Sequence, residues 1–273
     1  MRIGLLETDV LYDDLIKEYG SYGLMFEKYF SQLNISQLNI SQLDSAQLDG
    51  SPLEFVYYQV QQGELPLFLD ECDAYIITGS KAGVYESHDW IAPLSNWIRE
   101  ADQAQAKLLG ICFGHQLIAQ ALGGKVEMSD KGWGIGVRSL LTIPDSPFSQ
   151  PLPKYLDLIY SHKDQVVELP ATARNFLSDD FCPHAGFTIG KHIVSLQGHP
   201  EFSAIYSERL LNRRAETIGE PTYSKGIHSL RLSTDANFIG RLILDFLRPV
   251  EIQPVDETSA DSLQVEDETI QAE

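Results

Sequence analysis

A single cysteine, Cys112, stands between two glycines in the segment KLLGICFGHQLIAQALGG, residues 107–124. The pattern Gly110-x-Cys112-x-Gly114 has the spacing of a nucleophile elbow, in which a sharp strand-to-helix turn exposes the reactive side chain. The N-terminus of the following helix would favour the thiolate over the thiol. The backbone N–H of Phe113 would then face a developing oxyanion. A buried structural cysteine fits the same residues, so Cys112 alone leaves both interpretations open.

A partner base decides between the two interpretations. His199 ends an apolar run in VSLQGHPEF, residues 194–202, and Glu201 follows two positions later. In an extended chain, positions i and i+2 face the same side. The carboxylate can therefore accept from one ring nitrogen while the other nitrogen faces a thiol, as nucleophilic catalysis requires. Cys182 and His184 have no matching pair of ligands elsewhere, so a zinc site is not expected.

These residues must come together at the carboxyl ends of neighbouring strands, where open parallel sheets bind ligands. The sequence predicts strands over residues 2–7, 54–60, 74–78, 107–111, 136–143, 157–162, 187–190 and 192–200. It predicts helices over residues 11–30, 90–105, 115–124, 203–217 and 236–248. Alternation of strands and helices indicates an α/β fold with a mainly parallel sheet, whereas the Gly-rich region 124–200 is more typical of antiparallel strands.

Two segments stand outside this alternation. In residues 31–55 a leucine recurs every five positions, a period that fits neither a helix nor a strand, so residues 31–50 are interpreted as a low-complexity surface insertion. Residues 250–273 hold eight acidic residues and no lysine, arginine or aromatic residue, which predicts a disordered acidic tail; a partner-binding segment is the alternative. Residues 1–249 are then one domain.

Composition excludes several classes of protein. The net charge of −19 argues against nucleic-acid binding, which needs a basic surface. The chain contains no run of 18 or more apolar residues, so no membrane span is predicted. The N-terminus reaches Glu7 and Asp9 too early for a signal peptide, and three cysteines at irregular spacing suggest no disulfide framework. A reducing, cytoplasmic location is the simplest interpretation.

Four motifs together resemble the class I glutamine amidotransferases. They are GICFGHQ, GHPEF, the Gly-rich IITGSKAGVYE at residues 76–86, and YSHKDQVV at residues 160–167. The likeness covers residues 2–245 apart from residues 31–50, and extends to the free-standing GMP synthase-like group, which is similar to plant γ-glutamyl peptidases. It implies a flavodoxin-like sheet with helices on both faces.

The resemblance also implies roles for particular residues. Cys112 is the nucleophile, His199 the base and Glu201 the group that orients it. The oxyanion hole comes from Phe113 and the Gly79–Ser80 turn, although this turn reads GSKAG where many relatives have Gly-Gly-Pro. The amino-acid end of a glutaminyl group is held by Gln116, Ser161, His162 and Asp164. No metal or organic cofactor is implied.

The expected activity is hydrolysis of a γ-glutamyl amide, either glutamine or a γ-glutamyl peptide, through a cysteine thioester that releases ammonia or an amine. One alternative is a glutaminase subunit that delivers ammonia to a separate synthetase, because the chain has no phosphate-binding loop of its own. The other is a catalytically silent binding protein, against which the presence of Cys112, His199 and Glu201 together argues.

Overall fold

The computed structural model describes residues 1–37, 52–144 and 147–249. The main sheet contains β1 (Arg2–Glu7), β2 (Glu54–Gln59), β3 (Ala74–Ile77), β4 (Lys107–Ile111), β6 (Gly134–Thr142), β7 (Tyr155–His162), β9 (Ala173–Ser178), β10 (Gly186–Ile189) and β11 (Ile193–Leu196). A small sheet contains β5 (Lys125–Met128) and β8 (Asp164–Glu168). The helices are α1 (Asp13–Tyr19), α2 (Tyr22–Gln37), α3 (Ile91–Gln103), α4 (Phe113–Ala121), α5 (Ala204–Ile218), α6 (Thr222–Ser229) and α7 (Ala236–Leu247), with a 3-10 turn at Val60–Gln62.

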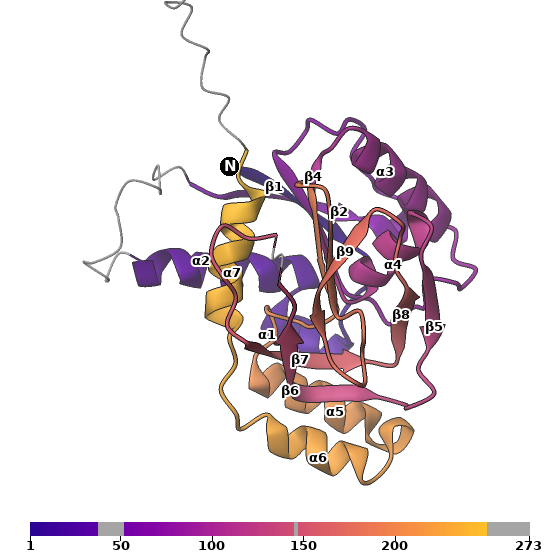
Figure 1. Cartoon of the computed structure of the whole chain (residues 1–273), viewed down its shortest axis with the longest axis vertical. Helices are drawn as coiled ribbons and strands as arrows, with labels where there is room; N and C mark the ends of the chain where they lie inside the picture. The colour runs from indigo at the N-terminus through magenta and orange to yellow at the C-terminus, as the bar shows by residue number, and fades with distance from the viewer. Residues whose placement is uncertain (38–51, 145–146, 250–273) are drawn as a thin grey trace, which may run out of the picture.

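The main sheet is parallel in one half and antiparallel in the other. Its strand order is β2-β1-β3-β4-β11-β10-β9-β6-β7 (Figure 1). The strands from β2 to β11 run parallel, and β10, β9, β6 and β7 each run antiparallel to their neighbours. This confirms the predicted α/β fold with its small antiparallel part.

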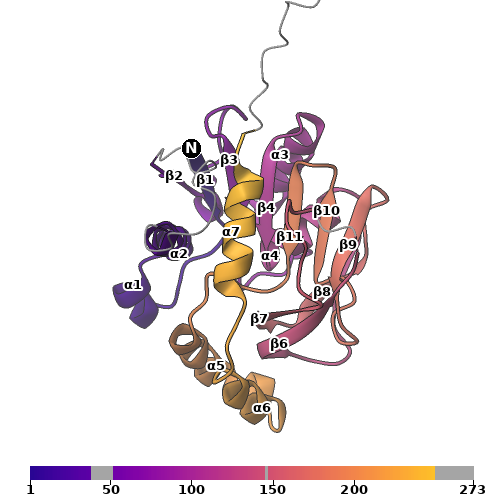
Figure 2. The same cartoon turned by 60° about the vertical axis from the view of Figure 1, so that its left-hand side comes forward.

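Helices cover both faces of the parallel half because its strands are apolar on both sides. Ile3 and Leu5 of β1 belong to the buried cluster that includes Phe26 of α2 and Ile239 of α7. Leu6 belongs to the opposite cluster, which includes residues of α3 and α4. Helices α5 and α6 lie at the end of the sheet away from the N-terminus of β1, the end where the parallel strands terminate (Figures 1 and 2).

The structure differs from the sequence-based expectation in a few places. Helix α2 continues to Gln37, and Leu33 on this helix is buried in the main apolar cluster, so the predicted surface insertion begins within a helix that packs on the core. The rest of that predicted insertion, residues 38–50, and the predicted tail, residues 250–273, lie outside the described residues. Strands β5, β8 and β9 and helix α6 were not predicted, because short elements such as KVEM, with one buried side chain, carry little periodicity. None of the helices in the described ranges is long and apolar enough to cross a membrane.

Candidate active site

Cys112 occupies a strained turn between β4 and α4. Its backbone angles are φ 51° and ψ −99°, in the half of the map that residues other than glycine rarely adopt. A side chain on Gly110 would begin 2.5 Å from Cδ1 of Ile118, and one on Gly114 would begin 2.4 Å from the carbonyl oxygen of Ile77. The strand and helix can approach this closely only because both positions are glycine. The predicted elbow is therefore present around Cys112.

His199 is held in one orientation just beyond the end of β11. Its backbone N–H donates to the carbonyl oxygen of Ile159 at 2.8 Å. Its ring Nδ1 lies 2.8 Å from Oε1 of Glu201, and the ring stacks on Phe202 with the centroids 3.8 Å apart. His199 is 3% exposed, and the Glu201 side chain is fully buried. With Nδ1 occupied by the carboxylate, Nε2 remains for a thiol.

Cys112 and His199 line one small cavity, which we call the Cys112 pocket. Gly79 also lines this pocket, as do the polar residues Ser80, Ser161 and Arg214. A Cβ atom added to Gly79 would lie 3.0 Å from Cε1 of His199 and 3.6 Å from Cβ of Cys112. The side chains of His199 and Cys112 therefore both lie next to Gly79.

The electrostatics of this pair favour a charged form. Burial by itself lowers the pKa of His199, but the Glu201 carboxylate and a negative charge on the Cys112 sulfur outweigh it and raise the pKa to about 10. The ring therefore stays protonated at neutral pH. An imidazolium beside a thiolate is the reactive state of a cysteine nucleophile.

The turn that was expected to form part of the oxyanion hole is tied to the loop after β1. The Ser80 hydroxyl donates to the carbonyl oxygen of Thr8 at 3.1 Å, and the Lys81 backbone N–H donates to Oδ2 of Asp9 at 2.7 Å. The Thr8 hydroxyl donates to the carbonyl oxygen of Gly79 at 3.1 Å. These bonds fix the turn although it lacks the Gly-Gly-Pro sequence, because the side chains of Ser80 and Thr8 take part in holding it.

Phe113 is the residue whose backbone N–H was expected to be the other donor of the oxyanion hole. It is the first residue of α4, so its backbone N–H has no carbonyl of the same helix to bond. The N–H groups of the first helical turn point out of the helix N-terminus, beside Cys112. The next N–H, that of Gly114, donates to the carbonyl oxygen of Thr78 at 3.2 Å, which holds the start of α4 against the end of β3.

Of the four residues expected to hold the substrate, the structure brings Ser161 to the Cys112 pocket. Gln116 instead donates through Nε2 to the carbonyl oxygen of Asp164 at 2.7 Å and to Oε1 of Gln197 at 3.0 Å. His162 is buried, and desolvation is the main reason that its pKa falls to about 4. The carboxylate of Asp164 accepts from the Tyr85 hydroxyl at 2.9 Å. Gln116 and His162 thus both bond the carbonyl oxygen of Asp164, and none of these three residues lines the Cys112 pocket.

Arg214 is a pocket residue that the sequence analysis missed. Its Nη1 donates to Oγ of Ser161 at 3.0 Å, and its Cζ lies 5.4 Å from the centre of the Trp133 ring. A guanidinium suits a carboxylate because its paired N–H groups match the two oxygens. The available signal was the pair Arg213-Arg214 on the helix that follows GHPEF. Apolar wall residues of the pocket, also not predicted, are Tyr22, Phe202 and Leu210.

The two remaining cysteines are buried elsewhere. Burial raises the pKa of Cys182 to about 12 and also raises that of Cys72, so neither is activated. Neither residue lines the Cys112 pocket. In the described part of the chain no group of three or more histidine, cysteine, aspartate or glutamate side chains is placed to hold a metal ion.

A cysteine elbow beside a buried His–Glu pair, at the carboxyl ends of parallel strands, defines an α/β protein with a candidate Cys-His-Glu triad. The chain belongs to the class-I glutamine amidotransferase family, whose model matches residues 36–214. Both GICFGHQ and GHPEF fall inside the matched region.

Sequence comparisons with individual proteins support this family assignment. The chain is 35% identical to γ-glutamyl peptidase 5 of Arabidopsis thaliana over 153 residues, which are 54% of this chain and 61% of that peptidase. It is 32% identical to the glutamine-hydrolysing GMP synthase of Thermotoga maritima over 159 residues, which are 58% of this chain and 30% of that enzyme. The chain therefore spans about six tenths of the first relative's length and less than a third of the second's.

A solved structure has the same fold. The crystal structure of a glutamine amidotransferase from Thermotoga maritima superimposes with a TM-score of 0.67 over 90% of this chain and 96% of that one. The two sequences are 21% identical, so the likeness concerns the fold.

Proposed function

We propose that this chain hydrolyses a γ-glutamyl amide through a thioester on Cys112. The observation that carries the proposal is the meeting of Cys112, on its strained turn, with the buried His199–Glu201 pair in one pocket. The name of the peptidase relative supports a γ-glutamyl bond as the bond that is cleaved.

In the first half of the reaction, the Cys112 thiolate attacks the γ-carbonyl carbon and a carbon–sulfur bond forms. The carbonyl oxygen becomes an oxyanion, which the backbone N–H groups of Phe113 and Ser80 stabilise; one such donor contributes roughly 3 to 4 kcal/mol in related sites. The carbon–nitrogen bond then breaks. The protonated ring of His199 gives its proton to the leaving nitrogen, so ammonia or an amine departs and a γ-glutamyl thioester remains.

In the second half, water attacks the thioester carbonyl while the now neutral ring of His199 takes a proton from it. The carbon–sulfur bond breaks and regenerates the thiolate beside the imidazolium, and the γ-carboxylic acid formed loses its remaining proton to solvent to become a γ-carboxylate. Glu201 holds Nδ1 throughout, so that Nε2 faces the reacting atoms in both halves.

Two polar side chains of the Cys112 pocket suit the α-carboxylate of a glutamyl group. Arg214 and the hydroxyl of Ser161 lie together there, and a guanidinium with a neighbouring hydroxyl can hold the α-carboxylate of an amino acid. The α-carboxylate is then fixed at one end of the substrate while the γ-carbon lies at Cys112. Substrate discrimination between γ-glutamyl and α-linked amides would follow from this spacing.

A second candidate is a glutaminase that passes ammonia to a separate synthetase. It is supported by the relative named GMP synthase, in which the matched 159 residues make up 30% of the protein. In that arrangement the same triad acts on glutamine, and hydrolysis depends on the acceptor partner.

The two candidates are separated by assaying glutamine and γ-glutamyl-alanine side by side, with ammonia and free alanine both measured. We expect cleavage of the dipeptide by the isolated chain, and expect Cys112→Ser to lower it by roughly a thousandfold or more while the fold is retained. Retention of a tenth of the activity in Cys112→Ser would remove the triad assignment. Cleavage of glutamine alone would favour the glutaminase.

A further inference from the structure

Two buried threonine hydroxyls surround the carbonyl group of Gly79. Oγ1 of Thr8, directly after β1, lies 3.1 Å from this carbonyl oxygen, and Oγ1 of Thr78, directly after β3, lies 3.2 Å from it. The Thr78 hydroxyl accepts from the Thr8 backbone N–H at 3.1 Å. The carbonyl oxygen of Thr78 is also 3.1 Å from the Thr8 hydroxyl, but it already accepts from the Gly114 N–H. The two side chains, 1% and 0% exposed, are called the threonine pair below.

The bound carbonyl fixes the direction of the next N–H group along the chain. The peptide bond between Gly79 and Ser80 is trans, so its C=O and N–H point in opposite directions. Gly79 and Ser80 line the Cys112 pocket, whereas neither threonine does. Since the C=O points to the threonine pair, the N–H of Ser80 points away from that pair. In the described part of the chain this N–H has no hydrogen-bond partner, so it remains available to an oxyanion.

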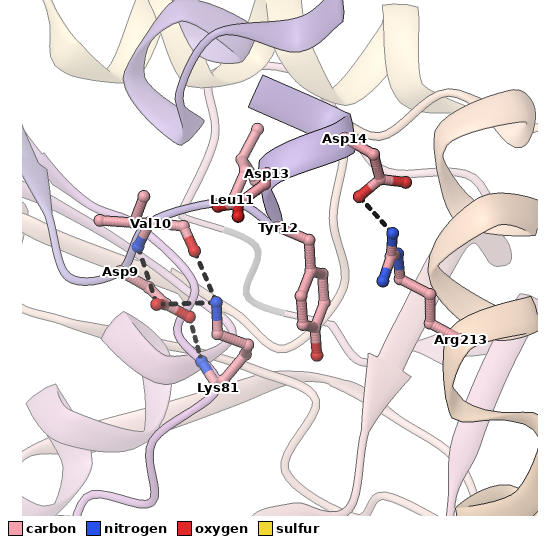
Figure 3. A pocket seen from close by; sticks show the side chains of 8 residues that line it. All are labelled: Asp9, Val10, Leu11, Tyr12, Asp13, Asp14, Lys81 and Arg213. Atoms are coloured by element: carbon pink, nitrogen blue, oxygen red, sulfur yellow. Dashed lines mark hydrogen bonds and ion pairs between the residues drawn. The ribbon is translucent and has the colours of Figure 1, made fainter. Parts of the chain in front are cut away.

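The far side of the same turn is held by Asp9. Its Oδ2 accepts from the Lys81 backbone N–H at 2.7 Å, and its Oδ1 accepts from the Val10 backbone N–H at 2.7 Å (Figure 3). Between these anchors, the Ser80 hydroxyl donates to the carbonyl oxygen of Thr8 at 3.1 Å. The peptide groups before and after Ser80 are therefore both bonded to the segment that follows β1.

The turn needs such bonds because its sequence allows the peptide group to rotate. Glycine adopts positive and negative φ about equally well, and the turn reads GSKAG where many relatives have the stiffer Gly-Gly-Pro. A rotated Gly79–Ser80 peptide would turn its carbonyl oxygen toward the oxyanion in place of its N–H. The threonine pair opposes this rotation, because the carbonyl would lose both hydroxyls.

We propose that Thr8 and Thr78 are positioning residues that aim the Ser80 N–H at the oxyanion formed on a substrate bound to Cys112. The inference rests on the proposed hydrolysis and adds to it the groups that orient one oxyanion donor. Neither threonine lines the pocket, and the oxyanion develops only in the transition state. Their removal should therefore lower kcat and leave KM nearly unchanged.

The test removes one hydroxyl at a time, and uses whichever of glutamine and γ-glutamyl-alanine the unaltered chain cleaves. In Thr8→Val and in Thr78→Val we expect kcat to fall by about tenfold to a hundredfold, with KM within about twofold, because a misdirected donor loses much of its effect. Thr8→Ser keeps a hydroxyl at this position and should retain kcat within about threefold.

The matched control is Thr188→Val on β10. This threonine is buried and its hydroxyl donates to the carbonyl oxygen of Ile193 at 2.8 Å, but it does not line the Cys112 pocket. We expect the control to lower the melting temperature about as much as Thr8→Val does and to leave kcat unchanged. A fall of kcat in the control equal to that in Thr8→Val would overturn the inference, since loss of any buried hydroxyl would then suffice.

Alkylation of Cys112 separates the oxyanion donor from the triad. Iodoacetamide reacts by displacement at its CH₂ carbon: the carbon–sulfur bond forms, iodide leaves, and the carbonyl oxygen gains no charge. The alkylation rate at pH 7 should therefore stay within about twofold in both valine variants. An alkylation rate that falls as much as kcat, or an unchanged kcat in either variant, overturns the inference and leaves the hydrolase intact. If the unaltered chain cleaves neither compound, the proposed hydrolysis itself is wrong.

Discussion

A side chain on Gly79 would begin 3.0 Å from Cε1 of His199, closer than carbon atoms normally approach. The flat face of the same ring stacks on Phe202, and its Nδ1 is bound to Glu201. The imidazole is therefore confined by a backbone segment, an aromatic ring and a carboxylate. The glycine of the turn that we expect to bind the oxyanion therefore also leaves room for the His199 ring.

Gly79→Ala should consequently lower kcat strongly while it changes the melting temperature only slightly. The added methyl group displaces either the His199 ring or the turn that carries Ser80, and a misplacement of about 1 Å can reduce the rate by roughly a hundredfold. We expect kcat to fall by about tenfold to a hundredfold, with the melting temperature changed by only a few degrees. Parallel assays of hydrolysis and thermal unfolding would measure this. Unchanged kcat would show that the ring moves freely.

Glu201→Gln should slow alkylation of Cys112 at neutral pH. The carboxylate raises the pKa of His199, so its loss makes the imidazolium, and with it the thiolate, less abundant. With iodoacetamide at pH 7 we expect the rate to fall by about tenfold, and the difference to vanish above about pH 9, where thiols ionise unaided.

Mass mapping of the three cysteines supplies the control for that experiment. Cys72 and Cys182 are buried and their pKa values are raised, so they should react slowly in both forms of the protein. Equal labelling of all three cysteines would contradict the assignment of Cys112 as the activated thiol.

Stability should fall as the pH is lowered from 6.5 toward 4. Desolvation first of all lowers the pKa of His115 to about 3 and that of His162 to about 4, so both rings are neutral in the folded chain. The unfolded chain binds a proton at each ring near pH 6.5, and the contribution of each ring is fully present above that pH. Below it, each ring lowers the free energy of unfolding by up to about 1.4 kcal/mol per pH unit.

Urea unfolding at several pH values would measure this slope. His115→Gln should make it shallower, because one of the two protons is no longer taken up on unfolding. Exposed His228 provides the matched control, His228→Gln, which should leave the slope as it is. A slope that does not respond to His115→Gln would mean that the ring is charged in the folded protein.

The domain boundaries proposed from the sequence are tested by two deletions. Replacing residues 38–50 with a short Gly/Ser linker, and ending the chain after Arg248, should each leave hydrolysis within a few-fold, because loop length changes stability only slowly. A longer deletion of residues 31–50 should destabilise the protein, since it removes the buried Leu33 of α2. Loss of turnover in the short deletion, with normal folding, would make residues 38–50 part of the site.

The sequence by itself determined the features that depend on neighbours along the chain. Apolar runs predicted the parallel strands β1, β3 and β4 because both of their faces are buried. The glycines around Cys112 predicted the elbow because strand and helix approach each other there at backbone distance. His199 and Glu201 were paired by their spacing in extended chain.

Only the tertiary structure decided which distant side chains meet. Ser161 and Arg214 are 53 positions apart, and they share the pocket because α5 packs beneath the end of β7. Gln116 precedes Gln197 by 81 positions, and its amide bonds that residue and not the pocket. Tyr12, on the loop after β1, lies between Lys81 and Arg213. Local periodicity carries no information about such contacts, because they are set by how whole helices and strands pack against one another.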